Sequence, residues 1–200
     1  MGNDQHPDKI KWNKKYAEKG LDSFEIRPAE WLRAHQPLLE GQEKGAALDL
    51  ACGNGRHAFY LAQLGFEVDA VDISDVAISW LTQQARQQNL AVNPKIMDLS
   101  QDPLPEETYQ VIVCFNYLER CLFPAIQQAL VPRGLLFFET VYRDDIAILG
   151  SKMNPRFVLD YNELLNTFLN LRVLEYREQI LYSQTLQKER AYASLIARKV

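Results

Sequence analysis

The sequence predicts an α/β fold with a doubly wound sheet of seven strands, mostly parallel and closed by a C-terminal antiparallel hairpin. Strand-like and helical runs alternate along residues 46–169, as expected for parallel strands joined by crossover helices. Two strand-like runs, 171–182 and 190–199, then follow each other. The 200 residues, 47% of them hydrophobic, fit one domain, with a helical segment (1–44) before the core (45–200).

The stretch 46–74 carries the main functional signal. A short apolar run, broken by Asp49, leads into the turn Cys52-Gly53-Asn54-Gly55, and the apolar residues after the turn follow helical spacing as far as Gly65. The next residues alternate in polarity up to a carboxylate, Asp72. A strand, glycine turn, helix, strand and acid form the Rossmann-like βαβ unit that binds an adenosine-bearing ligand.

Each part of this unit has a chemical reason. Gly53 and Gly55 lack a Cβ, so the backbone can take positive φ angles and a ligand can lie directly on the turn. The N–H groups at the start of the following helix favour a carboxylate or a phosphate. Asp72 is placed to accept both ribose hydroxyls. His57, two residues after the second glycine, is expected on the outer side of the first helical turn.

A nicotinamide cofactor must also be considered, because Gly53-x-Gly55-x-x-Ala58 satisfies the loose dinucleotide fingerprint. Asp49 argues against it, since a carboxylate four positions before the first glycine would repel a pyrophosphate. The same carboxylate would suit a ligand with an ammonium group and a sulfonium charge. An NAD-dependent oxidoreductase and a non-catalytic binding domain on the same fold are therefore the alternatives to an enzyme that uses such a ligand.

Residues 48–56, Leu-Asp-Leu-Ala-Cys-Gly-Asn-Gly-Arg, resemble motif I of the class I S-adenosylmethionine-dependent methyltransferases. The resemblance implies S-adenosyl-L-methionine as cofactor and S-adenosyl-L-homocysteine as product, with the methionine moiety on the glycine turn. Arg56 stands where the third glycine of the common pattern would be. Segments 116–118, 139–140 and 154–157 resemble a bacterial-type small-molecule subgroup with tellurite-resistance-like relatives.

The resemblance also assigns residues to the cofactor. Asp98, at the end of a strand predicted over 94–99, would face the adenine amino group, and the Leu99 backbone would line the ring. Trp12 and Tyr16 would belong to an N-terminal segment that folds over the cofactor as a lid, and the alternative is that these aromatic residues only pack on the sheet. The full set is Asp49, Ala51, Gly53, Gly55, Asp72, Ile73, Asp98, Leu99, Asn116, Trp12 and Tyr16.

The remaining elements follow from caps and periodicity. Pro28 fits the first turn of a helix that runs to about residue 39. Ser74 is expected to cap the helix after the second strand, and Asp160 with Glu163 makes a capping-box-like helix start. Further strands are predicted over 109–115 and 135–140, a helix over 121–130 and a loop over 145–156.

The predicted reaction is an in-line displacement, in which the protein aligns the reactants and excludes water. Catalysis by alignment requires no particular side chain, so no catalytic residue is assigned and the accepting atom stays open. The net charge of −4 and the absence of an Asn-Pro-Pro-Tyr signature favour a small-molecule acceptor over DNA. The acceptor pocket is expected to be lined by Tyr117, Arg120, Tyr142 and Arg156. The guanidinium groups of Arg120 and Arg156 could hold an anionic acceptor.

The three cysteines form no CxxC pair and their number is odd, so neither a metal site nor a disulfide framework is expected. A reducing cytoplasm fits this pattern. No apolar run reaches the length of a membrane span, so no membrane association is expected. The chain is expected to work as a monomer or a homodimer.

Overall fold

The computed structural model describes residues 5–183 and 186–200. Contacts divide the chain into two compact units, Met1–Pro103 and Leu104–Val200. The described part of the N-terminal segment packs within the first unit. The assignment of the whole chain to a single domain stays a prediction.

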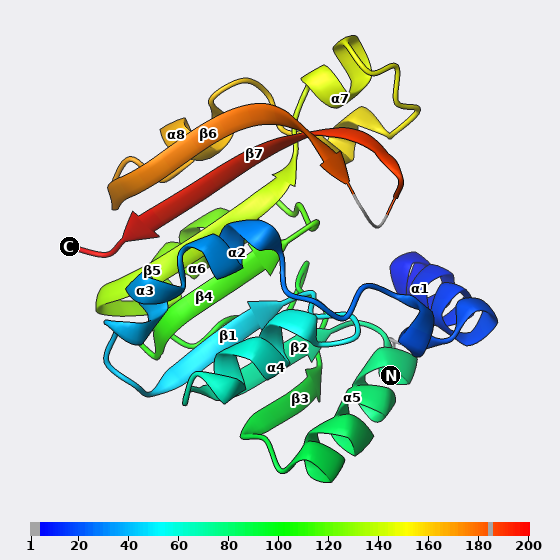
Figure 1. Ribbon diagram of the computed structural model, residues 1–200, viewed down its shortest axis with the longest axis vertical. Coiled ribbons are helices and arrows are strands. Elements are labelled where there is room, and N and C mark those ends of the chain that lie inside the picture. Colours follow the sequence, from blue (N-terminus) through cyan, green and yellow to red (C-terminus); the bar gives the residue numbers. More distant parts are fainter. Residues whose placement is uncertain (1–4, 184–185) are drawn as a thin grey trace. The chain divides into compact units, whose positions relative to one another are not determined.

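The first unit holds three parallel strands, β1 (Ala46–Leu50), β2 (Glu67–Asp72) and β3 (Val92–Ile96), with β2 in the middle. Helices α4 (Arg56–Gln63) and α5 (Asp75–Gln88) connect the strands and pack against them (Figure 1). The predicted βαβ unit is therefore confirmed. Ser74 caps α5 as expected, because its hydroxyl accepts a hydrogen bond from the Ala77 N–H at 3.1 Å.

The third strand lies earlier in the sequence than predicted. It covers residues 92–96 instead of 94–99, so Asp98 and Leu99 follow the strand and lie in the loop after it. Pro94 occupies the centre of β3, in register with Ala70 of β2. Proline has no N–H for a hydrogen-bond ladder and usually marks the start or edge of a strand, so a central proline gives a misleading boundary signal.

The segment before β1 is helical, but it does not contain the single helix predicted over residues 28–39. Its elements are α1 (Pro7–Lys19), the short 3₁₀ turn η2 (Leu21–Ser23), α2 (Glu30–Ala34) and α3 (Gln36–Glu40). Pro28 precedes α2, and the chain leaves helical geometry at His35. The break has a local cause, because Pro37 lacks the N–H that would continue the helical hydrogen bonds and is accommodated in the first turn of α3.

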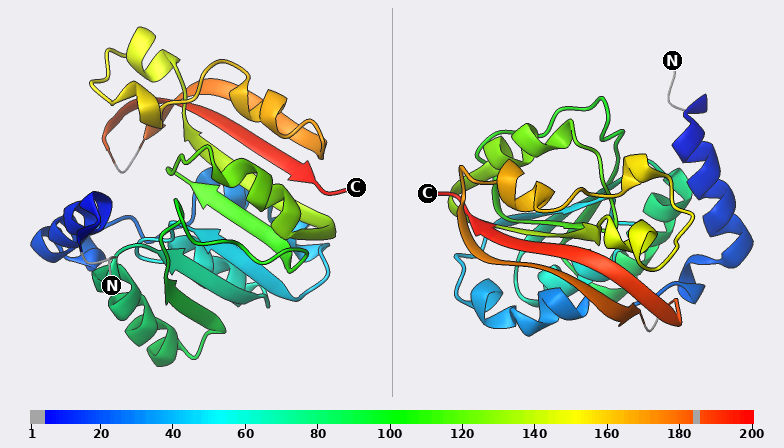
Figure 2. Two further views of the ribbon diagram at one scale, coloured as in Figure 1. Left: turned by 180° about the vertical axis from the view of Figure 1, so that it is seen from behind. Right: turned by 90° about the horizontal axis from the view of Figure 1, so that it is seen from above.

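The second unit contains four strands, β4 (Tyr109–Phe115), β5 (Leu130–Val141), β6 (Arg172–Ser183) and β7 (Lys188–Arg198). β4 and β5 are parallel, whereas β7 is antiparallel to both β5 and β6, which confirms the predicted hairpin. The helical elements are α6 (Leu122–Ala129), α7 (Asp144–Ala147), the 3₁₀ turn η3 (Pro155–Phe157) and α8 (Glu163–Thr167). Figure 2 shows α6 and α8 lying over the strands of this unit.

Three boundaries in the second unit differ from the prediction. β5 begins at residue 130 instead of 135, because the Pro-Arg-Gly segment forms an irregularity inside the strand rather than a loop before it. Helix α7 occupies the beginning of the predicted loop 145–156. Helix α8 begins after Asn162, although one half of the predicted capping box is present: the Glu163 carboxylate accepts a hydrogen bond from the Asp160 N–H at 2.8 Å.

An aromatic cluster fills the core of the second unit. The ring of Phe123 lies 5.9 Å from that of Phe138 and 5.4 Å from that of Phe168. All three side chains are buried, so α6 and α8 are held on β5 by apolar packing. Within the part of the chain that the structure describes, no helix is long and apolar enough to cross a membrane.

Gly55 is required by the packing of the first unit, and this requirement can be tested. Its φ angle is +75°, and a Cβ added to it would lie 2.2 Å from Cδ1 of Leu81 on α5. Gly55→Ala should therefore lower the free energy of unfolding by about 2–5 kcal/mol, through left-handed strain and overpacking. Urea denaturation of the full chain measures the loss.

Gly65→Ala is the matched control. Gly65 also has a positive φ angle, +91°, but a Cβ there would meet no atom within 4 Å. Only the backbone strain of about 1–2 kcal/mol applies at this position. Equal losses for the two variants would contradict the contact between the turn and α5.

Candidate cofactor site

The turn after β1 has an unusual backbone. Ala51, Gly53 and Gly55 have φ angles of +53°, +54° and +75°, so every second residue of the turn is left-handed. A left-handed alanine costs about 1–2 kcal/mol, and such strain persists only where the surroundings hold it. The strained turn thus lies at the carboxyl end of β1, where open α/β sheets bind their ligands.

Acceptors within the protein already hold the N–H groups of this turn. The Gly53 N–H donates to Oδ2 of Asp72 at 2.9 Å. The Gly55 N–H donates to the Cys52 carbonyl at 2.9 Å, and the Cys52 N–H donates to the Val71 carbonyl at 3.0 Å. These three donors are not free for a ligand carboxylate or phosphate. The turn offers a ligand a shaped backbone surface.

Asp72 lies at the end of β2 and is 6% exposed. Its Oδ2 accepts the Gly53 N–H, and its Oδ1 accepts the Ser74 N–H, both at 2.9 Å. Burial raises the pKa of the carboxyl group, and the backbone N–H bonds from Ser74, Gly53 and Ile73 oppose that rise. A carboxylate oxygen has more than one acceptor position, so both oxygens are fixed and can still accept hydroxyl groups from a ligand.

Asp49 has a partner that the sequence did not reveal. Its carboxyl group is 1% exposed, and its Oδ2 accepts a hydrogen bond from the Ala58 N–H in the first turn of α4 at 3.0 Å. A negative charge is favourable at this end of a helix. Burial nevertheless raises the pKa of Asp49 to about 7. An internal carboxylate therefore occupies the place where a pyrophosphate would bind, which disfavours a dinucleotide.

The prediction that His57 lies on the outer side of α4 is wrong. Its side chain is 5% exposed, with Nδ1 4.0 Å from Oδ1 of Asp49. Nε2 accepts a hydrogen bond from the Ala29 N–H at 3.3 Å. Burial lowers the pKa of the imidazole well below its ordinary value, and the nearby Arg56 lowers it further, so His57 is neutral at neutral pH. The covering segment comes from 28 residues earlier in the chain, which explains why helical spacing alone misplaced this side chain.

Helix α1 covers the glycine turn. Tyr16 is 8% exposed, and a Cβ added to Gly53 would lie 3.1 Å from its hydroxyl oxygen. Trp12 stacks on Tyr16 with the ring centroids 5.5 Å apart. Burial raises the pKa of Tyr16, and Asp72 and Cys52 raise it further, so the hydroxyl keeps its proton. Among the described residues, no group accepts a hydrogen bond from this hydroxyl, which leaves a donor on a largely buried side chain beside the turn for a ligand.

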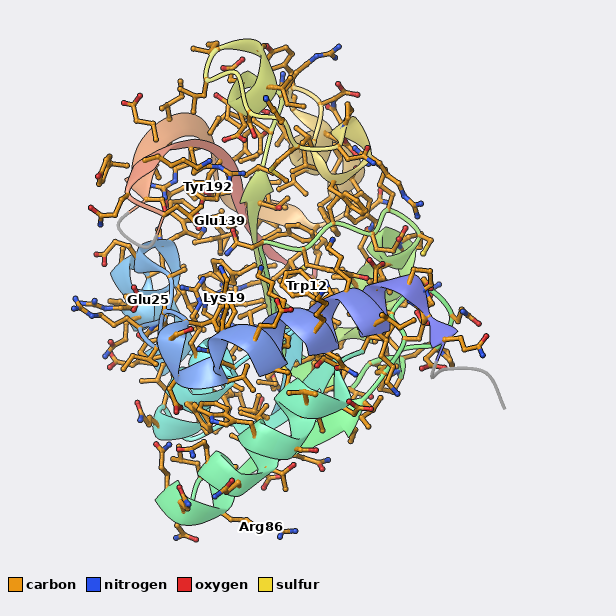
Figure 3. The ribbon with its side chains drawn as sticks, turned by 90° about the vertical axis from the view of Figure 1, so that its right-hand side faces the viewer. Trp12, Lys19, Glu25, Arg86, Glu139 and Tyr192 are labelled. Carbon is orange, nitrogen blue, oxygen red and sulfur yellow. The ribbon has the colours of Figure 1, made fainter. Side chains whose placement is uncertain are left out.

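Polar contacts fasten α1 to the start of α5. Oδ1 of Asn13 accepts a hydrogen bond from the Ser74 hydroxyl at 2.6 Å, and its Nδ2 donates to Asp75 at 2.8 Å. The ammonium group of Lys9, almost fully buried, lies 3.1 Å from Oδ2 of Asp75. Because the Ser74 N–H also bonds to Asp72, α1 is connected through one serine to the predicted ribose carboxylate. Figure 3 shows α1 lying beside α5.

Asp98 is held firmly in the loop after β3. Its Oδ1 accepts hydrogen bonds from the Ser100 N–H and hydroxyl at 3.0 and 2.6 Å, and its Oδ2 accepts one from Gln101 at 2.9 Å. Nε2 of His6 lies 3.9 Å from Oδ2 of Asp98. His6 also caps α1, since its Nδ1 accepts the Asp8 N–H at 3.2 Å. No sequence signal identified His6, because its contact with Asp98 is purely tertiary.

The first unit thus brings most of the predicted cofactor residues to the loops after its three strands, beneath α1. Leu99 is buried in the same loop as Asp98, and Ile73 is half-buried next to Asp72. Asn116 belongs to the second unit, where it follows β4 with a φ angle of +56°. Among the described residues, no group of three or more His, Cys, Asp or Glu side chains is placed to hold a metal ion.

In the second unit, the predicted acceptor residue Arg120 already makes four hydrogen bonds within the protein. Its guanidinium Nε and Nη2 donate to the two oxygens of Glu163 at 2.6 and 2.9 Å. Nη1 and Nη2 also donate to the carbonyl groups of Arg156 and Val158, at 2.8 and 3.0 Å. These bonds neutralise the charge of Arg120 and fasten η3 to α8, so its observed role is structural.

The other predicted acceptor residues are also engaged. Arg156 is exposed, with Nη2 3.6 Å from a carboxylate oxygen of Glu119. Tyr142 is 4% exposed, and its hydroxyl donates to Asp144 at 2.9 Å. Burial raises the pKa of Tyr142, and the bond to Asp144 raises it further. Tyr117 is half-buried in the loop after β4. The contacts of all four residues with an acceptor stay predictions.

Comparison with known proteins finds a family model over the part of the chain that contains this site. Residues 47–134 match the methyltransferase domain family, a span that begins in β1 and includes the glycine turn, Asp72 and Asp98. This match and the relatives described below confirm the predicted resemblance to the class I S-adenosylmethionine-dependent methyltransferases. The cofactor of this class is S-adenosyl-L-methionine.

Three relatives are similar to this chain in sequence. The putative methyltransferase YqeM of Bacillus subtilis is 32% identical over 55% of this chain and 46% of its own length. The probable S-adenosyl-L-methionine-dependent methyltransferase TehB of Haemophilus influenzae is 27% identical over 76% of this chain and 56% of its own. A ubiquinone biosynthesis O-methyltransferase of Coxiella burnetii is 30% identical over 56% and 50%. The chain spans about half the length of these curated relatives.

The fold is also found among solved structures. The crystal structure of TehB from Haemophilus influenzae superposes with a TM-score of 0.76 at 19% identity, covering 94% of this chain and 67% of that one. This likeness, together with the strand pairing inside each unit, confirms the predicted fold class, a mostly parallel Rossmann-like sheet with a C-terminal antiparallel hairpin.

The hydrogen bonds of Asn13 to Ser74 and Asp75 are expected to slow the local opening of α1. Asn13→Ala removes two side-chain hydrogen bonds, so the local opening of α1 should become easier by roughly 1–2 kcal/mol. Hydrogen exchange of the α1 amides should then be about tenfold faster, since 1.4 kcal/mol corresponds to a factor of ten. Mass spectrometry of the exchanged peptides measures the change.

Asn93→Ala is the control, because Asn93 also donates to a carboxylate, that of Asp69, but on an exposed strand. It should leave exchange in α1 unchanged. If Asn13→Ala gave the same α1 exchange as Asn93→Ala, the proposed attachment of α1 would be incorrect.

Proposed function

We propose that this chain transfers the methyl group of S-adenosyl-L-methionine to a small-molecule acceptor by in-line displacement. The observation that carries the proposal is the arrangement around Asp72. A buried carboxylate, fixed by the N–H groups of Gly53 and Ser74, lies between a strained glycine turn and the covering helix α1. This arrangement suits a ligand that presents ribose hydroxyls to an acid and an extended chain to the turn.

The residues present fit the cofactor of this class. Asp72 would accept the ribose hydroxyls, and the surface of the turn at Gly53 would hold the methionine moiety. Asp98 and the backbone of Leu99 would bind the adenine. The hydroxyl of Tyr16, which keeps its proton, would donate to an oxygen of the ligand. When bound, the cofactor supplies a methyl group already activated by a sulfonium charge.

The contribution of the chain is then alignment and exclusion of water. Holding two reactants in line can supply on the order of 7–11 kcal/mol of the barrier. Tyr16 and Trp12 close the turn from the α1 side, and the bonds of Asn13 keep α1 in place. Exclusion of water also favours methyl transfer, because the reaction consumes the positive charge of the sulfonium group. No side chain has to donate or accept a proton unless the acceptor is protonated.

A small-molecule acceptor is supported by composition and by one relative. The net charge of −4 does not suit a broad nucleic-acid surface. A relative that is 30% identical is a ubiquinone biosynthesis O-methyltransferase, which acts in the synthesis of a small molecule. We further propose that the chain acts in the cytoplasm as a monomer or a homodimer, in line with its three free cysteines.

A ligand panel tests the proposal. S-adenosyl-L-methionine, S-adenosyl-L-homocysteine and NAD are compared by thermal unfolding of the full chain. A ligand at a hundredfold excess over its dissociation constant stabilises the folded state by about 2.7 kcal/mol. We expect the first two ligands to raise the melting temperature and NAD to have no effect. A rise with NAD alone would favour the oxidoreductase alternative, and no rise with any of the three would contradict cofactor binding.

The raised pKa of Asp49 predicts a pH dependence of cofactor binding. Below about pH 7 the buried carboxyl group is mostly protonated, and above it the group is ionised. If the ionised form attracts the cofactor's ammonium group, affinity for S-adenosyl-L-homocysteine should increase as the pH rises through that value, by roughly tenfold for one charge-assisted contact. Isothermal titration calorimetry over this pH range measures the increase.

Asp49→Asn isolates the effect, because asparagine keeps an acceptor for the Ala58 N–H but cannot ionise. The cofactor's own amino group titrates equally in both experiments, so the difference between the two pH curves belongs to Asp49. Parallel curves would show that this carboxyl group does not act on the bound cofactor.

A further inference from the structure

Helix α1 carries a row of three lysines. Lys11, Lys15 and Lys19 are four residues apart, so they follow one side of the helix; we call them the lysine row. Figure 3 shows Lys19 and Trp12 on the side of α1 that α5 does not cover. The row is therefore directed away from the contacts that attach α1 to α5, in a chain whose net charge is −4.

Lys15 is fixed in place by aromatic rings. Its ammonium nitrogen lies 4.1 Å from the centroid of the Trp12 ring and 5.6 Å from that of Phe24. The side chain is half-buried. Two cation–π contacts restrict a side chain that is normally among the most mobile on a protein surface. A ligand anion would thus meet an ammonium group whose conformational entropy is already lost.

Lys15 and Lys19 differ from Lys9 and Lys14 of the same helix. Lys9 is paired with Asp75 at 3.1 Å, and Lys14 with Glu18 at 3.8 Å. Within residues 5–183 and 186–200, no carboxylate forms an ion pair with Lys15 or Lys19. Like charges four residues apart on a helix destabilise it. Burial lowers the pKa of Lys15, and its neighbours Lys19 and Lys11 lower it further. Lys15 and Lys19 thus repel each other in the free chain, and a bound anion would relieve this repulsion.

The position of Lys15 connects this group of charges with the cofactor site. Lys15 lies on Trp12, Trp12 stacks on Tyr16, and the Tyr16 hydroxyl lies against Gly53 of the turn. Only two side chains therefore separate the ammonium group from the backbone that would hold the methionine moiety. An anion at Lys15 would belong to a molecule large enough to reach the site beneath α1.

We propose that Lys15, together with Lys19, binds an anionic oxygen group of the methyl acceptor, either a carboxylate or a phosphate. This inference rests on the proposed function, and it names the chemical class of the acceptor. Recognition depends on a fixed positive charge, with Lys19 one turn away along the helix. An acceptor that carries its anionic group several bonds from its reactive atom could then contact α1 through the anion while the reactive atom approaches the methyl donor.

Calorimetry with two probe anions tests the proposal. The full chain is first titrated with S-adenosyl-L-homocysteine, and the saturated protein is then titrated separately with inorganic phosphate and with benzoate. Lys15→Met keeps the apolar stem on Trp12 and removes the charge, whereas Lys14→Met removes a charge from the same helix at a position paired with Glu18. We expect at least one probe to bind, with about tenfold lower affinity in Lys15→Met and unchanged affinity in Lys14→Met.

Loss of affinity in Lys15→Met but not in Lys14→Met, with recovery in Lys15→Arg, supports the site, and the probe that binds identifies the carboxylate or phosphate class. Equal affinity in Lys15→Met and the wild type, or no binding of either probe, overturns the proposal. The initial titration distinguishes this from a failure of the proposed function, since S-adenosyl-L-homocysteine would still bind. A chain that does not bind S-adenosyl-L-homocysteine contradicts the proposed function itself.

Discussion

The site depends on the carboxylate of Asp72. One oxygen accepts the N–H of Gly53, in the turn after β1, and the other accepts the N–H of Ser74, which caps α5. The Ser74 hydroxyl in turn donates to Asn13 on α1. A single buried acid therefore fixes a turn, a helix start and a covering helix in relation to one another. Without it, two buried N–H groups would lose their acceptors, so the same interaction shapes the site and stabilises it.

This arrangement concentrates negative charge in a small buried volume. Burial raises the pKa of both Asp49 and Asp72, and the charge of Asp72 raises that of Asp49 further. For Asp49, the contribution to folding stability is complete below its ordinary pKa of 3.8 and is lost as the pH rises through about 7. The folded chain thus tolerates electrostatic strain at neutral pH. A cationic ligand would relieve that strain and a pyrophosphate would increase it, which favours a sulfonium cofactor over NAD.

The sequence was informative where a local pattern determines the structure. The Gly53-Asn54-Gly55 turn and Asp72 could be placed because alternation, glycine and helical spacing all operate within a few residues. The same reasoning failed for residues that are positioned by contacts with distant parts of the sequence. His57 is buried because Ala29, far away in sequence, lies against it, and His6 meets Asp98 only through the fold. Strand β5 begins before the predicted residue 135 because Gly134 lies in close contact with β4. A Cβ added to Gly134 would lie 2.9 Å from the carbonyl oxygen of Tyr109.

The charged residues show most clearly what sequence alone could not decide. Arg120 and Lys15 both appear in the sequence as cations that could meet an anion, and residue type gives Arg120 the advantage, because a guanidinium group binds carboxylates in a bidentate fashion. The surroundings of the two side chains differ. Arg120 already uses its bidentate geometry on Glu163, whereas Lys15 lies on an aromatic ring beside other lysines. An anion would have to displace Glu163 from Arg120, but at Lys15 it would reduce an existing repulsion. The availability of a charge, which depends on its neighbours in space, therefore indicates where an anionic acceptor would bind.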